Sequence, residues 1–142
     1  MSADPTWLQD YGPHLGFIVR QIGRFVLPGV IAIPLALAFP SLRRALRDKL
    51  AMAAFCAVPL LWMFLVPWSA VFVAAMDGEH HSPWWAQMPL YICFWGWPAV
   101  AGILIWRAKG ARIVSAGYAL LNAVAWLFVG FVAAMAINGD WI

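Results

Sequence analysis

Long apolar runs alternate with short polar stretches along the chain, and this pattern predicts helices that cross a membrane. The runs cover approximately residues 15–39, 50–76, 84–106 and 113–137. A helix needs about 20 apolar residues to cross roughly 30 Å of hydrocarbon. The last three runs contain no charged residue in their interiors. The predicted fold is therefore all-α: a polytopic integral membrane protein, folded as a bundle of four transmembrane helices with short loops, in one domain over residues 1–142.

The first apolar run is irregular. Arg20 and Arg24 interrupt it, and the remaining 15 residues, 25–39, would rise only about 22 Å as a helix. Either the helix begins earlier and its arginines snorkel to one interface, or it is short and thins the bilayer locally. Pro28 and Pro34 add a predicted kink or broken turn.

Composition excludes a soluble globular domain. The chain is 65% hydrophobic and 11% charged, with a mean hydropathy of +0.81, whereas soluble domains are about half apolar and a quarter charged. A soluble domain of this size buries only about 70% of the surface that its unfolded chain exposes. The net charge of +3 does not indicate nucleic acid binding, because the basic residues lie mainly in the links between apolar runs. We expect no nucleic acid partner.

The distribution of charge predicts an orientation. The first and third links hold most of the basic residues, which are Arg43, Arg44, Arg47, Lys49, Arg107, Lys109 and Arg112. Basic links favour the cytoplasmic side, so four crossings would leave both termini and the acidic second link outside. We expect a multi-pass protein of a bacterial inner membrane. Within the first link, Ser41 is a predicted helix N-cap, and Arg44 is positioned to pair with Asp48.

Tryptophan agrees with this layout. The chain has ten Trp residues, a tryptophan-rich composition, and Trp prefers the membrane interfaces, where its ring is in apolar surroundings and its N–H finds a partner. Those near the predicted outer interface are Trp7, Trp68, Trp84, Trp85 and Trp141, and Trp106 lies near the inner one.

The first candidate site is the pair Arg20 and Arg24, which share one face of a helix at i,i+4 spacing. One interpretation is an anion-binding or ion-pairing site at the outer mouth of the bundle, with Asp10, Asp77 and Glu79 as the available carboxylates. The other interpretation is that both arginines reach lipid phosphates and anchor the helix.

The second candidate site is a metal site in the second link, formed by Glu79, His80 and His81. Carboxylate and imidazole groups suit zinc or copper, although adjacent histidines rarely bind one ion together. The alternative is a solvated turn that separates two helices. We predict no cofactor, and we expect contacts with lipids.

A third group of residues is predicted to pack helices together. Asn122 is the polar residue deepest in an apolar run, and side-chain amides at that depth usually hydrogen-bond to a neighbouring helix. Gly130 and Ala134 are four residues apart, a spacing that lets helices approach closely. Packing inside the bundle and docking to another subunit would both use such residues.

These features leave two main classes of function. The first is a structural or accessory subunit of a larger membrane complex, whose partners are lipids and either other membrane subunits or further copies of the chain. The second is a small transporter or channel, for an anion, with Arg20 and Arg24 near its outer mouth. An intramembrane enzyme is the least supported class, because no nucleophile–base pair can be assembled from the sequence.

Overall fold

The computed structural model describes residues 6–73 and 84–138, and all regular secondary structure in these ranges is helical. The long helices are α1 (Thr6–Leu37), α3 (Lys49–Val73), α4 (Met88–Arg107) and α5 (Arg112–Asn138). A short helix, α2 (Pro40–Ala45), connects α1 to α3, and a 3-10 helix, η1 (Trp84–Gln87), precedes α4. The predicted all-α class is confirmed.

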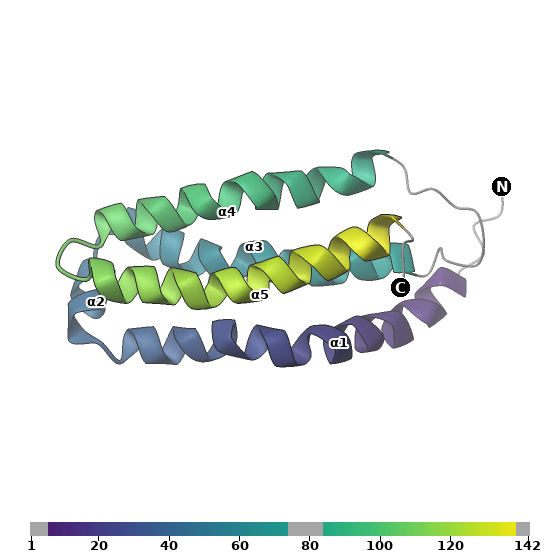
Figure 1. Ribbon diagram of the computed structural model, residues 1–142, viewed down its shortest axis with the longest axis horizontal. Helices are drawn as coiled ribbons and strands as arrows, with labels where there is room; N and C mark the ends of the chain where they lie inside the picture. The colour runs from purple at the N-terminus through teal and green to yellow at the C-terminus, as the bar shows by residue number, and fades with distance from the viewer. Residues whose placement is uncertain (1–5, 74–83, 139–142) are drawn as a thin grey trace.

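The four long helices lie side by side, and each runs antiparallel to the one before it (Figure 1). Helix α5 makes its most extensive contacts with α1 and α3, and it also packs against α4. Helices α1 and α4 lie at opposite edges of the bundle, with α3 and α5 between them (Figure 1). Of these two inner helices, α5 has the more extensive contact with α1, and α3 has the more extensive contact with α4.

Three of these helices are long and apolar enough to cross a membrane. They cover Lys49–Val71, Trp84–Arg107 and Arg112–Asn138. The apolar part of α1, Ile22–Ala38, is shorter and rises about 25 Å. The expected membrane bundle is supported for three spans, and within the described residues the fourth predicted span is represented by this shorter apolar stretch of α1, which contains Arg24.

Helix α1 differs from the prediction in its continuity. It begins at Thr6, well before the apolar run, and it remains helical through Pro13, Pro28 and Pro34. The predicted broken turn does not occur. Each proline removes one backbone hydrogen bond, but α1 packs along α5 and α3, and neighbouring helices stabilise such positions.

Among the described residues, the core extends along the bundle as two large apolar clusters and a small third one. The large cluster nearer α2 contains Leu42 and Leu104, the other large cluster contains Ile18, and the small one consists of Ala86 and Ile137. Alanine fills many of the remaining buried positions, including several on α5. Small side chains let the helix backbones approach closely and pack by van der Waals contact.

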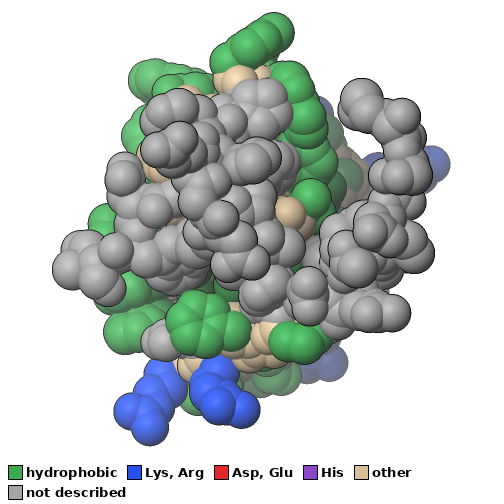
Figure 2. Space-filling model, turned by 90° about the vertical axis from the view of Figure 1, so that its right-hand side faces the viewer, with side chains coloured by type: hydrophobic (Ala, Val, Ile, Leu, Met, Phe, Trp, Pro, Cys, Tyr) green, Lys and Arg blue, Asp and Glu red, His purple; other side chains and the backbone are tan. Residues whose placement is uncertain are grey.

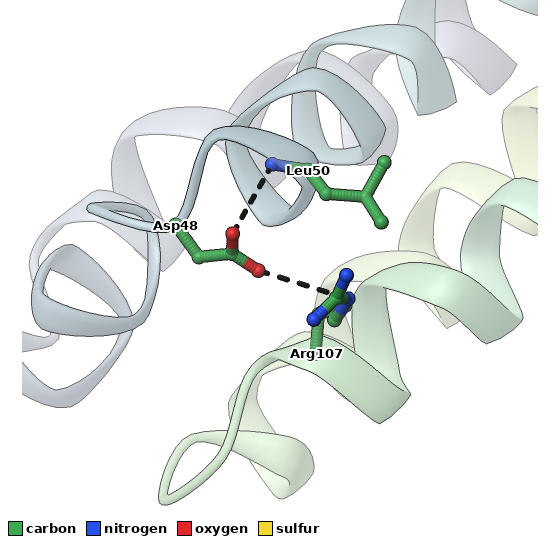
Figure 3. A network of polar contacts seen from close by, with 3 residues as sticks. All are labelled: Asp48, Leu50 and Arg107. Atoms are coloured by element: carbon green, nitrogen blue, oxygen red, sulfur yellow. Dashed lines mark hydrogen bonds and ion pairs between the residues drawn. The ribbon is translucent and has the colours of Figure 1, made fainter.

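The first and third links meet at the α2 end of the bundle. Asp48 Oδ1 accepts a hydrogen bond from the Leu50 backbone N–H at 3.4 Å, and Asp48 Oδ2 lies 3.8 Å from Arg107 Nε (Figure 3). Asp48 thus pairs with Arg107, whereas the sequence predicted Arg44 as its partner. The Ser41 prediction is also wrong: α2 begins at Pro40, a residue suited to the first helical position, and has no side-chain cap.

Candidate functional site

A buried polar network lies between α3 and α5 at the centre of the bundle. Asn122 on α5 is fully buried, and its Oδ1 accepts a hydrogen bond of 3.1 Å from Trp62 Nε1 on α3. Its Nδ2 donates to the backbone carbonyl of Tyr118 at 3.0 Å. Both polar atoms of the amide are therefore engaged within the bundle, one of them across two helices.

The same network continues toward the α2 end through Tyr118. Its hydroxyl donates a 2.9 Å hydrogen bond to the backbone carbonyl of Phe55, and its ring stacks on the Phe55 ring with centroids 4.4 Å apart. In a regular helix this carbonyl would accept from the residue four positions later, which here is Pro59 and has no N–H. Tyr118 therefore satisfies a carbonyl that a proline inside α3 leaves without its helical partner.

Helix α1 meets the network at Gly29. A Cβ atom at this position would lie 3.0 Å from Ala125 Cβ, 3.3 Å from Asn122 Oδ1 and 3.3 Å from Trp62 Cζ2. Any side chain would force these neighbours to shift, so the absence of one lets α1 pack closely on α3 and α5 here. Sequence reasoning missed this role of Gly29, because a Pro-Gly pair is typical of a break in a helix.

The small residues predicted to set a close approach lie elsewhere. A Cβ at Gly130 would have no heavy atom within 4 Å among the described residues, so Gly130 does not govern packing inside this part of the chain. It lines a groove of about 190 Å³ with Phe94 and Trp126. Ala134 borders a smaller groove, next to the 2.9 Å hydrogen bond that Gln87 Nε2 donates to Asn138 Oδ1.

The two arginines of α1 are exposed on the outer face of the helix. The buried side of α1 is marked by Ile18, Ile22 and Ala36, and Arg20 and Arg24 fall on the opposite side because a helix turns 100° per residue. Figure 2 views the end of the bundle where α1 begins, and Lys and Arg side chains project outward from its lower rim, on the α1 side. The arginines therefore do not line a mouth between helices.

Neither arginine has a carboxylate partner within the part of the chain that is described. Asp48, whose ion pair is with Arg107, belongs to the opposite end of the bundle. Of the carboxylates considered as partners, Asp77 and Glu79 lie outside the described residues, as does the side chain of Asp10. Within the described residues, the positive charge of both guanidinium groups is therefore not neutralised by a carboxylate.

The candidate metal ligands Glu79, His80 and His81 also lie outside the described residues. Within residues 6–73 and 84–138, no three His, Cys, Asp or Glu side chains come close enough to hold a metal ion.

Helix α4 presents a second unusual outward face. Its buried side carries Cys93 and Leu104, whereas Trp95 points away from the bundle and is 72% exposed. Trp95 lies twelve residues before Arg107, about 18 Å from the basic end of the helix. This Trp is therefore near the middle of the candidate span, not at an interface. Tyr91 and Ala99, one turn to either side, are exposed with it.

Two larger surface grooves are apolar. A groove of about 400 Å³ between α3 and α4 is lined by Leu60, Phe64 and Ile92 among others, and one of about 300 Å³ between α1 and α5 includes Phe39 and Ile113. Neither has a charged side chain in its lining. Such grooves suit hydrocarbon chains or apolar protein surfaces better than an ion path.

Comparison of the chain with protein-family models, with curated proteins and with solved structures found no match in any of the three.

Proposed function

We propose that this chain is a structural or accessory subunit of a larger membrane complex, and that it docks on a different membrane subunit through the outer face of α4. The observation that supports this proposal best is the exposure of Trp95 near the middle of a candidate span.

Tryptophan exposed to lipid normally lies at the interfaces, where its N–H can reach water or a headgroup. At the depth of Trp95 the indole N–H has neither, and a protein partner that accepts its hydrogen bond removes that cost. The surface of α4 around Trp95 also favours a protein partner. Tyr91, Ala99 and Gly102 are exposed on this side of α4, and such a mixture of aromatic and small residues suits close packing against another helix.

The interior of the bundle favours a structural role over transport. Trp62, Tyr118 and Asn122 are buried at its centre and bond to one another or to backbone carbonyls. A transport path needs polar groups that exchange partners with a substrate, whereas these three side chains already form hydrogen bonds within the bundle. The two arginines that would attract an anion face away from this centre.

In this proposal α1 crosses the membrane as a fourth span, and the chain has a fixed orientation in the bilayer. Helix α1 runs alongside α5 in the bundle (Figure 1), so a bilayer that surrounds α5 surrounds α1 too. The basic links at the α2 end would face the cytoplasm of a bacterial cell, with the protein in the inner membrane and both termini outside.

The test is purification of the tagged chain from its native membrane in a mild detergent, followed by mass spectrometry. We expect a stoichiometric second membrane protein. Trp95→Leu, which stays apolar but loses the ring and its N–H, should sharply reduce recovery of that partner. Trp84→Leu is the matched control, since Trp84 is 74% exposed but lies at the end of the span. Recovery of the chain alone or as a homo-oligomer would reject the accessory role, and equal effects of both variants would reject the docking face.

A further inference from the structure

We propose that Arg20 and Arg24 form a phosphate-binding site on the outer face of α1, occupied by the headgroup of an anionic phospholipid. This site lies on the edge of the bundle opposite α4, so it does not depend on the docking surface described above (Figure 1).

The two arginines share one face of α1. Arg20 and Arg24 are one turn apart and both exposed, which places their Cβ atoms about 5–6 Å from each other. Guanidinium groups at that spacing can flank one phosphate from two sides and donate several charge-assisted hydrogen bonds to it.

The position of the two arginines along α1 sets their depth in the membrane. Gly29 lies beside Asn122, so the two residues are at the same depth in the bundle. Asn122 lies ten residues after the start of α5, which is about 15 Å along the helix, or half the thickness of the hydrocarbon layer. Arg24 and Arg20 precede Gly29 by five and nine residues, which places them about 7.5 and 13.5 Å from that level. Helical side chains lean toward the N-terminus of their helix, which for α1 is toward the nearer membrane surface. Both guanidinium groups can thus reach the phosphate layer.

The remainder of the same face of α1 is apolar. Below the arginines it continues with Leu27, Ile31 and Leu35, which are 53%, 56% and 53% exposed. Their spacing from Arg24 repeats every three or four residues, so the five side chains form one stripe along α1. A phospholipid has this same order of groups, a phosphate above a hydrocarbon chain. A free anion would not use the apolar part of the stripe, and a partner helix would need a carboxylate inside the hydrocarbon.

The choice of an anionic headgroup follows from charge balance. Two guanidinium groups without a carboxylate partner in the described chain present two positive charges to one headgroup. The ammonium group of a zwitterionic lipid would be repelled by them, whereas a headgroup with net negative charge would not.

The experiment measures lipid binding to the isolated chain by native mass spectrometry, with phosphatidylglycerol and phosphatidylcholine of the same acyl chains as probes. We expect selective retention of phosphatidylglycerol. Arg20→Ala combined with Arg24→Ala should weaken its binding about tenfold or more and leave phosphatidylcholine unaffected. Arg20→Lys with Arg24→Lys should retain part of the affinity, because charge persists without the planar fork.

The matched control is Arg43→Ala with Arg47→Ala, an exposed pair with the same spacing at the other end of the bundle. Its removal should weaken binding much less. Equal losses in both double variants would show that binding follows overall charge and would overturn the site. Displacement of the lipid by millimolar inorganic phosphate would assign the site to a free anion instead. Loss of a co-purified subunit with lipid binding intact would assign the arginines to a protein carboxylate. Failure of docking through α4 would leave the lipid measurement unchanged.

Discussion

Helices α5 and α1 both carry polar side chains, but those of α5 point toward the centre of the bundle and those of α1 point away from it. Asn122 and Tyr118 of α5 face the centre, where Trp62 and the Phe55 carbonyl satisfy them. Arg20 and Arg24 of α1 face outward, and the described chain offers them no carboxylate. The direction of a polar side chain therefore separates two roles: an inward group stabilises this fold, and an outward one requires a partner outside the chain.

The largest loss of stability is expected from a substitution at Gly29, where α1 meets the buried polar network between α3 and α5. Gly29→Leu would push Ala125, Asn122 and Trp62 aside and should destabilise the bundle by about 3 kcal/mol. The measurement is thermal unfolding in detergent. Gly23→Leu, on the same helix, is the control, because a Cβ at Gly23 has no described heavy atom within 4 Å. Equal losses in the two variants would show that α1 does not pack at Gly29 as described.

The second largest loss of stability is expected from Asn122→Leu. It keeps the number and branching of the side-chain heavy atoms but leaves the Trp62 N–H without an acceptor in the core, and we expect a loss of about 1–2 kcal/mol. Asn138→Leu removes an amide that also accepts a hydrogen bond, but at an exposed position, so its cost should stay within about 0.5 kcal/mol. Unfolding by denaturant in micelles compares the two. A larger loss from Asn138→Leu would contradict the central role of Asn122.

Tyr118→Phe should cost less, about 0.6 kcal/mol, since it removes one hydroxyl and keeps the stacking on Phe55. A double-mutant cycle with Pro59→Ala isolates the reason. Alanine restores the N–H that can satisfy the Phe55 carbonyl, so Tyr118→Phe should be less costly in that background. An unchanged cost would show that the hydroxyl does not compensate for the proline.

The smallest effect on stability is expected from the outward-facing arginines of α1. Arg20→Ala with Arg24→Ala should change the stability of the isolated chain in detergent by no more than about 0.5 kcal/mol, because both side chains are exposed. Gel filtration and thermal unfolding provide the check. A marked loss of stability would mean that the arginines hold the bundle together, and the contrast between α1 and α5 would fail.

The candidate sites differ in how far a pattern could predict them. Asn122 stood out because an amide in an apolar run needs a hydrogen-bond partner, and the structure supplies Trp62. That partner is sixty residues away in the chain, so no local pattern could name it. The pairing of Tyr118 with the carbonyl that Pro59 leaves free was hidden for the same reason. The face to which Arg20 and Arg24 point required the position of α1 against α5, because the sequence shows only that they share one side.

Hydropathy along the chain was enough to predict an all-helical membrane protein with short links, since apolar runs of this length have no stable place in water. The charge pattern predicted that the first and third links lie on the same side of the membrane, and in the structure they meet at one end of the bundle. The interhelical packing was beyond such patterns. The position of α5 between α1 and α4, the close approach at Gly29 and the outward direction of the arginines depend on how helices distant in sequence fit together. That fit is set by side-chain shape and by hydrogen bonds between helices.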